Sequence, residues 1–302
     1  MFARLFLLIV GISAGATSVI FIKDSEVPPM LLSAYRLLGG GLLLSPLMLR
    51  DLRRHRSAFG RRHVRRAALP GVVLGLHFIT WIEGARMTLA ANASLIVNMV
   101  PVAMPFLMLA MIRERINRGE ALGTLAAMAG VGLLAWSDYT FSPEHFRGDL
   151  ICLGSMVLFA LYLALGRRNR DFPTIWLYVV PVYLIGGAFC FLVGLAFHHP
   201  AAGDYPRDLW MILGLAVVPT IIGHSTLNWC MKHMRGQVVG IATLGQFIFA
   251  GVMAYFYPPL REAPTWTFYP ASVLVVVGAV VSLRATPPTR VEAEAEGLAE
   301  SG

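Results

Sequence analysis

Apolar residues follow one another in long runs along nearly the whole 302-residue chain. Each run has about 20 residues, enough for a helix to cross the roughly 30 Å hydrocarbon core of a bilayer. Backbone groups in lipid must bond to one another, so these runs are predicted to be helices. The pattern predicts ten helices, near residues 5–22, 28–49, 67–87, 88–112, 120–137, 148–166, 173–197, 209–230, 236–257 and 266–283.

The last five runs repeat the order of the first five. A shift of 145 residues places residues 85–101 on 230–246, and each of these segments joins two runs and enters the second of them. Because each half has an odd number of spans, the two copies would insert with opposite orientations. The predicted fold is therefore an all-α polytopic membrane protein of ten transmembrane helices in two inverted five-helix repeats. The repeats are expected over 1–140 and 141–284, followed by a disordered cytoplasmic tail over 285–302.

The composition agrees with a membrane protein, and the charges predict its orientation. Hydrophobic residues make up 57% and charged residues 14% of the chain, whereas a soluble domain is nearer half apolar and a quarter charged. Of the 25 Lys and Arg residues, 19 fall in segments on the side of the N-terminus and five on the other side. This bias follows the positive-inside rule and predicts a multi-pass protein of the cytoplasmic (inner) membrane with both termini cytoplasmic.

The net charge of +8 raises the question of a nucleic-acid partner. The densest basic segment, Arg50–Arg66, contains no aromatic residue between its arginines except Phe59. Single-stranded nucleic acids are bound by basic grooves with interleaved aromatic side chains. We therefore expect this segment to face anionic lipid and expect no nucleic-acid partner.

The first run has a second interpretation. Arg4, an apolar stretch and the small residues 13–16 resemble a secretory signal with its cleavage site. However, the apolar stretch continues to Ile22 and has a counterpart in the second half, which favours a retained helix.

The cysteines at 152, 190 and 230 lie within predicted spans and show neither metal-ligand spacing nor a disulfide framework. No metal and no cofactor is expected.

Polar and aromatic side chains recur at helical spacing on several predicted spans. His77 and Trp81 are four residues apart, as are His224 and Asn228, so each pair shares a helix face. Polar groups in lipid are costly unless they face a cavity or bond between helices. The first alternative predicts a wet, aromatic-lined cavity that suits a small amphipathic ligand. Its expected substrate-binding residues are His77, Trp81, Asn98, Tyr162, His224, Asn228, Trp229 and Gln246.

Two charged residues also lie within predicted spans. Arg36 is in the second helix, and Glu83 is near the outer end of the third. One interpretation is that they pair and lock the two helices together. The functional alternative makes Glu83 a proton carrier or Arg36 a carboxylate anchor. Proton relay is also possible at His77 and His224, because a neutral imidazole exchanges protons near neutral pH.

Several short motifs, taken together with their order over ten helices, resemble the EamA-type branch of the drug/metabolite transporter superfamily. The stretches are Pro28-Pro29 with Ala34-Tyr35-Arg36, Asn98-Met99-Val100-Pro101-Val102, Arg113-Glu114-Arg115, Leu161-Tyr162-Leu163 with Gly166-Arg167-Arg168, and Val218-Pro219-Thr220 with Gly223-His224 and Asn228-Trp229. The resemblance implies cytoplasmic termini, a central cavity between the halves, and export of small metabolites such as amino acids. The chain departs from many relatives at Ser13-Ala14-Gly15, where they carry Trp-Gly, and at Gln246-Phe247, where they carry an acidic residue and proline.

The expected function is export of small amphipathic metabolites, amino acids first among them, by alternating access and without enzymatic activity. The expected partners are the small-molecule substrate and the lipid bilayer, and the expected form is a monomer. Two alternatives stay open at this point. Ser13 lies in a Gly-x-Ser-x-Gly string like that of hydrolase nucleophile elbows, and with His77 or His224 it would make an intramembrane serine hydrolase. The other alternative is a passive channel for small solutes.

Overall fold

The fold is a bundle of long helices. A computed structural model describes residues 2–88, 90–138, 143–197, 205–257 and 266–285, and all regular elements in these residues are helical. The tail predicted to be disordered lies, from residue 286 on, outside the described residues. Among the described residues, eight helical segments are long and apolar enough to cross a membrane, and Phe268–Arg284 is a shorter apolar helix.

The helices group into the ten spans that the apolar runs predict. In chain order they are α1 (Phe2–Ala16) with α2 (Ser18–Asp24), α3 (Pro29–Arg54), α4 (Arg61–Met87), α5 (Ala90–Val97) with α6 (Val100–Ile112), α7 (Arg118–Asp138), α8 (Pro143–Arg168), α9 (Trp176–Phe197), α10 (Tyr205–Leu215) with the π-helix η1 (Ala216–His224) and α11 (Ser225–His233), α12 (Gly236–Leu244) with α13 (Gln246–Phe256), and α14 (Phe268–Arg284). Large apolar side chains such as Phe106, Leu192 and Val273 are exposed around the outside, as expected of a surface in lipid.

Counterpart helices of the two halves pack on each other. Helix α3 lies along α9, α7 along α14 and α6 along α12, while the contact of α4 with α8 is matched by that of α1 with η1. The paired helices run antiparallel. In the pair α3–α9, for example, Gly41 lies against Leu184 and Gly194 lies against Leu31. Antiparallel counterparts are the arrangement that an inverted repeat requires.

Close packing of α7 on α14 depends on glycine, and this gives a testable prediction. A Cβ atom on Gly123 would lie 2.5 Å from the Gly278 carbonyl oxygen, whereas one on Gly132 of the same helix would meet open space. Small residues let membrane helices approach closely, and overpacking costs about 1–3 kcal/mol. We expect Gly123→Ala to lower the thermal unfolding temperature in detergent and Gly132→Ala to leave it unchanged or raise it. Equal temperatures for the two variants would contradict this packing.

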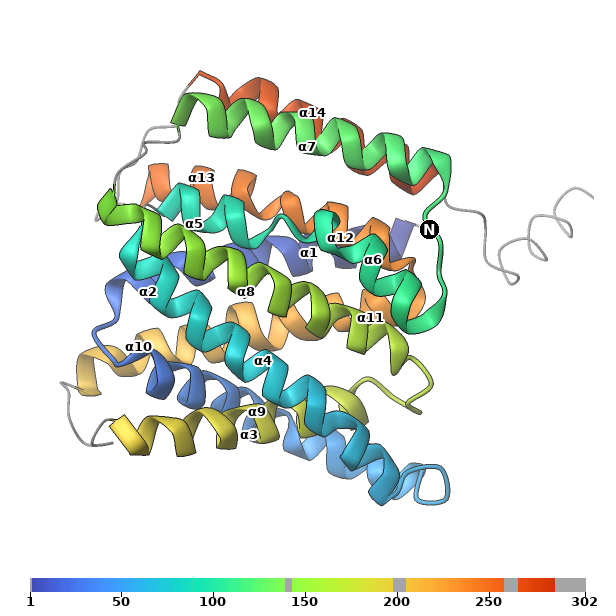
Figure 1. Ribbon diagram of the computed structural model, residues 1–302. Coiled ribbons are helices and arrows are strands. Elements are labelled where there is room, and N and C mark those ends of the chain that lie inside the picture. The colour runs from blue at the N-terminus through green and yellow to red at the C-terminus, as the bar shows by residue number, and fades with distance from the viewer. Residues whose placement is uncertain (1, 89, 139–142, 198–204, 258–265, 286–302) are drawn as a thin grey trace, which may run out of the picture.

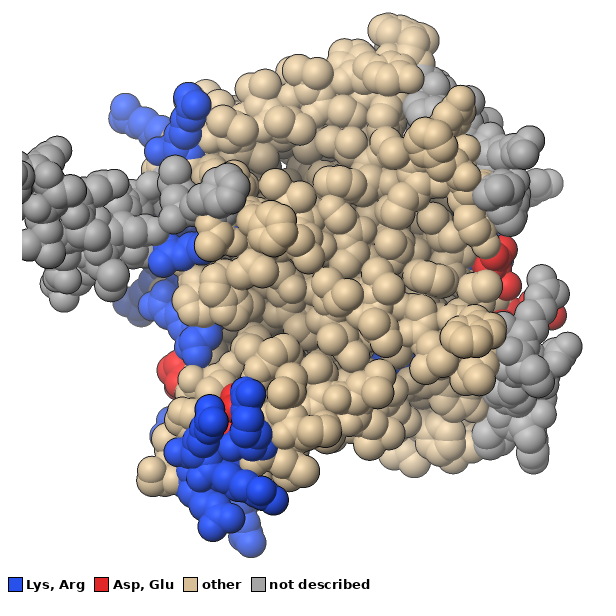
Figure 2. Space-filling model, turned by 180° about the vertical axis from the view of Figure 1, so that it is seen from behind, with Lys and Arg blue, Asp and Glu red and all other residues tan. Residues whose placement is uncertain are grey.

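The two ends of the bundle differ in charge. The N-terminus, the segments 55–60 and 113–117 and the C-terminal end of α14 lie at one end, called here the basic end (Figure 1). Figure 2 shows Lys and Arg gathered at this end, and a broad band of uncharged residues separating it from the opposite end. This is the distribution that the basic residues of the sequence predict.

Polar contacts join the two halves at the basic end. Arg167 at the end of α8 donates to Glu114 Oε2 at 3.0 Å and to the Met231 carbonyl oxygen at 3.1 Å. The backbone N–H of Gly236 donates to the other oxygen of Glu114 at 3.1 Å. A second ion pair joins Arg235 to Glu120, whose side chain is fully buried. These bonds tie the first turn of α7 and the segment before it to the ends of α8 and α11 and to the start of α12.

The opposite end is held by carbonyl groups. Arg86 at the end of α4 donates to the carbonyl oxygen of Ile22 in α2 and to those of Ser25 and Val27, in the segment between α2 and α3. Shifted by 145 residues, Val27 falls on Phe172, whose carbonyl oxygen accepts from Lys232 near the end of α11. In each half, the segment that joins the first span to the second is thus bound by a basic side chain of the third span, Arg86 in the first half and Lys232 in the second. The chain therefore has matching closures at its two ends.

Candidate functional site

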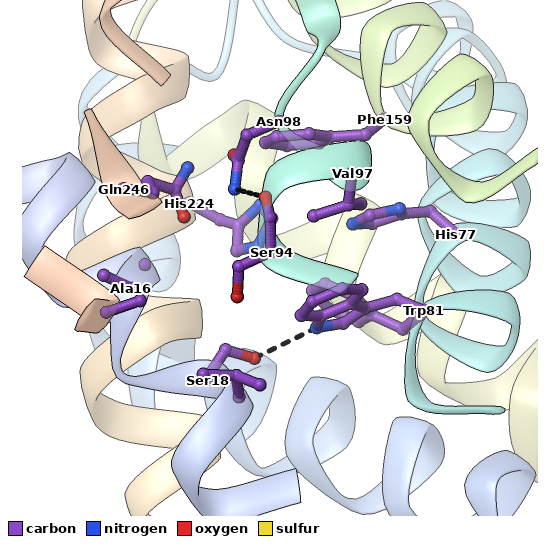
Figure 3. Close-up of a pocket in the computed structure, with 14 residues that line it drawn as sticks. Ala16, Ser18, His77, Trp81, Ser94, Val97, Asn98, Phe159, His224 and Gln246 are labelled. Carbon is purple, nitrogen blue, oxygen red and sulfur yellow. Dashed lines mark hydrogen bonds between the residues drawn. The ribbon is translucent and has the colours of Figure 1, made fainter. Parts of the chain in front are cut away.

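A cavity lies between the two halves of the bundle (Figure 3). Its free volume is about 30 Å³, room for about one or two water molecules, whereas small-molecule sites typically hold about 300–1,000 Å³. A ligand of that class therefore requires the cavity to widen. Both halves contribute to its wall. The lining residues are Gly15, Ala16, Ser18, Val19, His77, Phe78, Trp81, Ser94, Val97, Asn98, Phe159, His224, Gln246 and Ala250.

One wall of the cavity consists of rings. The His77 ring stacks on Phe159 with centroids 4.8 Å apart and planes 12° apart. His224 meets the edges of Phe78 at 4.9 Å and Phe159 at 5.6 Å. Trp81 is four residues after His77 and lies beside it in the wall. Such a surface can hold the flat or aliphatic part of a ligand through apolar and edge-to-face contacts.

Polar groups on the wall have bonding capacity left for a ligand. Asn98 Nδ2 donates to the Ser94 carbonyl oxygen at 2.8 Å, but Asn98 Oδ1 is buried without a partner among the described residues. The same holds for Nδ1 of His224. Buried polar atoms without partners are costly, so each of them favours a ligand that supplies the missing bond. Figure 3 shows Gln246 on the neighbouring helix facing Asn98 across the cavity.

His77 is held in one orientation from outside the cavity. Its Nδ1 lies 3.1 Å from the Ser155 carbonyl oxygen and 2.9 Å from the Ser155 hydroxyl oxygen, while that hydroxyl donates to the His77 carbonyl oxygen at 3.0 Å. A carbonyl oxygen only accepts, so Nδ1 carries the proton in a neutral ring. Nε2 of His77 is then the acceptor.

Breaks in the helices coincide with the cavity. The fourth span is interrupted at Asn98–Met99 and the ninth at Gly245, beside Gln246. Shifted by 145 residues, Asn98–Met99 falls on Thr243–Leu244, directly before Gly245. The π-helix η1 of the eighth span contains Pro219 and ends at His224. Interrupted helices at matching positions mark the binding sites of many secondary transporters, and π-helical turns often occur at functional sites.

Comparisons with known proteins identify the family. The model of the EamA-like transporter family matches residues 1–136 and again residues 146–284. The chain belongs to the EamA-like transporter family. It is similar to an uncharacterized transporter of Archaeoglobus fulgidus, with 25% identity over 274 residues that cover 89% of this chain and 92% of the relative. A solved crystal structure has the same fold, with a TM-score of 0.75 at 20% identity, and the match covers 94% of this chain and 97% of the other.

In this EamA-like chain seven of the eight predicted substrate-binding residues fall into two groups. His77, Trp81, Asn98, His224 and Gln246 line the cavity together. Tyr162 and Asn228 lie behind it, where Asn228 Nδ2 donates to Tyr162 Oη at 2.5 Å and to the His224 carbonyl oxygen at 2.7 Å. Their visible role is to hold each other and the end of η1.

The expectation that Trp229 lines the cavity is wrong. Its ring packs on His233 with centroids 4.2 Å apart, and it is absent from the cavity wall. The physical reason is the helical geometry, because adjacent residues of a helix point about 100° apart. Asn228 and Trp229 therefore face different surroundings.

The expected pairing of Arg36 with Glu83 is also wrong. Arg36 is fully buried, and its Nε donates to Thr220 Oγ1 at 3.0 Å. Glu83 is exposed at the end of α4. Glu83 points outward because its neighbours Ile82 and Gly84 occupy the buried face of the helix.

Sequence reasoning missed Ser18, Phe78 and Phe159. The first span breaks at Thr17, whose hydroxyl donates to the Ala14 carbonyl oxygen at 2.8 Å. The break moves the polar lining position to Ser18. The two phenylalanines carry no signal of their own, since apolar side chains fill both the core and the lipid face of such a helix.

Proposed function

We propose that this EamA-like protein exports small amphipathic metabolites, amino acids first among them, by alternating access. The observation that carries the proposal is the cavity between the two inverted halves, whose wall combines aromatic rings with buried polar atoms that lack partners. Inverted repeats around one central site are the architecture in which one half rocks against the other. The repeats are taken as 1–140 and 141–284, acting within a monomer in the cytoplasmic membrane.

Export can be tested in cells fed with dipeptides, which load the cytoplasm with amino acids. Cells that produce the protein are expected to release at least one amino acid faster than cells with an empty vector. Cells that produce Trp81→Ala, which removes the largest ring of the wall, are the matched control and should release it more slowly. Equal release in all three would contradict amino-acid export.

The serine hydrolase alternative has little geometric support. The Ser13 hydroxyl donates to the Ile9 carbonyl oxygen at 2.8 Å within its own helix, and Ser13 does not line the cavity that contains His77 and His224. A general base must lie within hydrogen-bonding reach of its nucleophile. The arrangement of the described residues thus favours binding over nucleophilic catalysis.

The proposed orientation places the basic end in the cytoplasm. Ala58 lies in an exposed turn at this end, so a cysteine there is a suitable reporter. In intact cells Ala58→Cys is expected to resist a membrane-impermeant maleimide and to react once the membrane is permeabilised. Reaction in intact cells at the rate seen after permeabilisation would reverse the proposed topology.

A further inference from the structure

Arg36 is a buried cation within α3, one of the helices long and apolar enough to cross a membrane. Its side chain has no exposed surface, and its guanidinium carbon lies 3.8 Å from the centre of the Phe78 ring. Besides the bond to Thr220, Nη1 lies 3.4 Å from the Ser18 hydroxyl oxygen. Nη2 has no hydrogen-bond partner among the described residues. The guanidinium therefore has bonding capacity left on the side of its terminal nitrogens.

No carboxylate in the described part of the chain balances this charge. The ion pairs found there join Arg50 to Asp51, Arg66 to Asp171, Arg167 to Glu114 and Arg235 to Glu120. All of them lie near the basic end, outside the cavity. A charge in the bilayer region is costly without a partner, and an arginine does not escape this cost by losing its proton.

The unbalanced charge lies directly behind the cavity wall. Ser18 and Phe78, which contact Arg36, also line the cavity. The Ser18 hydroxyl oxygen further accepts from Trp81 Nε1 at 3.4 Å (Figure 3). The wall itself contains no Asp, Glu, Lys or Arg. The nearest charge that a ligand meets is therefore positive, in surroundings where little water weakens it.

We propose that the cavity takes a ligand with a carboxylate, which acts as the counter-ion of Arg36. The carboxylate lies at the Ser18 side, where the Ser18 hydroxyl, whose oxygen accepts from Arg36 and Trp81, has its own proton to donate. The apolar part of the ligand rests on Trp81 and Phe159, and its other polar groups meet Asn98 and His224. Cationic amines without a carboxylate are excluded, because Arg36 repels them and no acidic side chain attracts them. This inference rests on the proposed function only in that the bound ligand is the transported one.

Matched pairs of compounds test the proposal with the purified full-length protein. The pairs are phenylacetate with phenylacetamide, L-phenylalanine with L-phenylalaninamide, and L-leucine with L-leucinamide. Binding is followed by quenching of tryptophan fluorescence and by thermal stabilisation in detergent. We expect at least one carboxylate to bind, about tenfold or more tighter than its amide, which corresponds to about 1.4 kcal/mol. Amides that bind as well as their acids, or the absence of binding by every carboxylate, would overturn the proposal.

Two variants assign the preference to Arg36. Arg36→Gln should lose the preference for the carboxylate, while Arg36→Lys, which keeps the charge, should retain most of it. A preference that is unchanged in Arg36→Gln would overturn the role of this residue. Binding of each acid and its amide to the unmodified protein decides the ligand class even if Arg36→Gln does not fold. Export of amino acids from dipeptide-fed cells without any such preference would leave the proposed function standing and remove only this inference.

Discussion

Asn98→Ala and His224→Ala are expected to reach the membrane in normal amounts and to transport roughly ten- to a hundredfold more slowly than the unmodified protein. Asn98 Oδ1 and His224 Nδ1 are the buried atoms of the cavity wall that lack partners. A substrate that bonds to one of them gains about 1.5–3 kcal/mol when a charged group takes part, which is a factor of about 10 to 150 in affinity. Removal of either side chain should take this contribution away.

The control for these variants is another polar residue in a span. Ser13 has a hydroxyl that is bonded within its own helix and does not line the cavity, so Ser13→Ala should transport normally. The initial rate of uptake into liposomes, measured at several substrate concentrations, separates affinity from maximal rate. Normal kinetics in both cavity variants would mean that Asn98 and His224 hold helices together, and the cavity would not be the substrate site.

The second large effect is expected from Glu114→Ala, which should open the basic end. Glu114 and Arg167 are nearly buried, with side chains 13% and 9% exposed, and removal of one partner of a buried ion pair costs about 3–5 kcal/mol. The cost falls on the conformation in which the pair forms, so the population shifts toward conformations that are open at this end. A loss of about 3 kcal/mol corresponds to roughly a hundredfold change in that equilibrium.

A cysteine in the cavity reports this opening. Ser94→Cys is read out with an impermeant maleimide in inside-out vesicles, and the native cysteines give little background because all three are buried. Labelling should be roughly a hundredfold faster after Glu114→Ala and should return toward normal in the exchange Glu114→Arg with Arg167→Glu.

The control is Asp171→Ala, which removes the exposed ion pair with Arg66 at the same end and should leave labelling nearly unchanged. Arg66 lowers the pKa of Asp171 by hydrogen bonding, but this carboxylate is 58% exposed, and such pairs contribute about 0–1 kcal/mol. If Glu114→Ala also left labelling unchanged, the Arg167–Glu114 pair would not control access.

The fold could be predicted from the sequence because each of its determinants is local or repeated. The length of the apolar runs fixes the spans, and the match of 85–101 with 230–246 fixes the relation of the halves. The second run was predicted to begin near residue 28, and α3 begins at Pro29. The breaks inside spans were not predicted. The runs 88–112 and 236–257 read as continuous, but the chain interrupts them at Asn98–Met99 and at Gly245.

The candidate site could be predicted only in part, because it depends on the rotation of each helix. His77, Trp81 and Asn98 stood out as polar or aromatic residues on one face, and the structure brings them together. The partner of Arg36 could not be found in this way. It is Thr220, 184 residues away and on a π-helix, whose wider turn no hydrophobic period indicates. Phe159 likewise differs from a lipid-facing phenylalanine only through its tertiary contacts.

The central claim is a substrate site that opens in turn to the two sides of the membrane. Counterflow in liposomes tests this claim most directly. Purified protein is reconstituted in liposomes loaded with an excess of the unlabelled amino acid that dipeptide-fed cells release, and the labelled amino acid is added outside. A carrier should take up the label transiently above its equilibrium level, with a rate that saturates, and Asn98→Ala should do so much more slowly. A passive channel would equilibrate without this overshoot, and a hydrolase would react with a serine-directed phosphonate. An absent overshoot with correctly folded protein would contradict transport by alternating access.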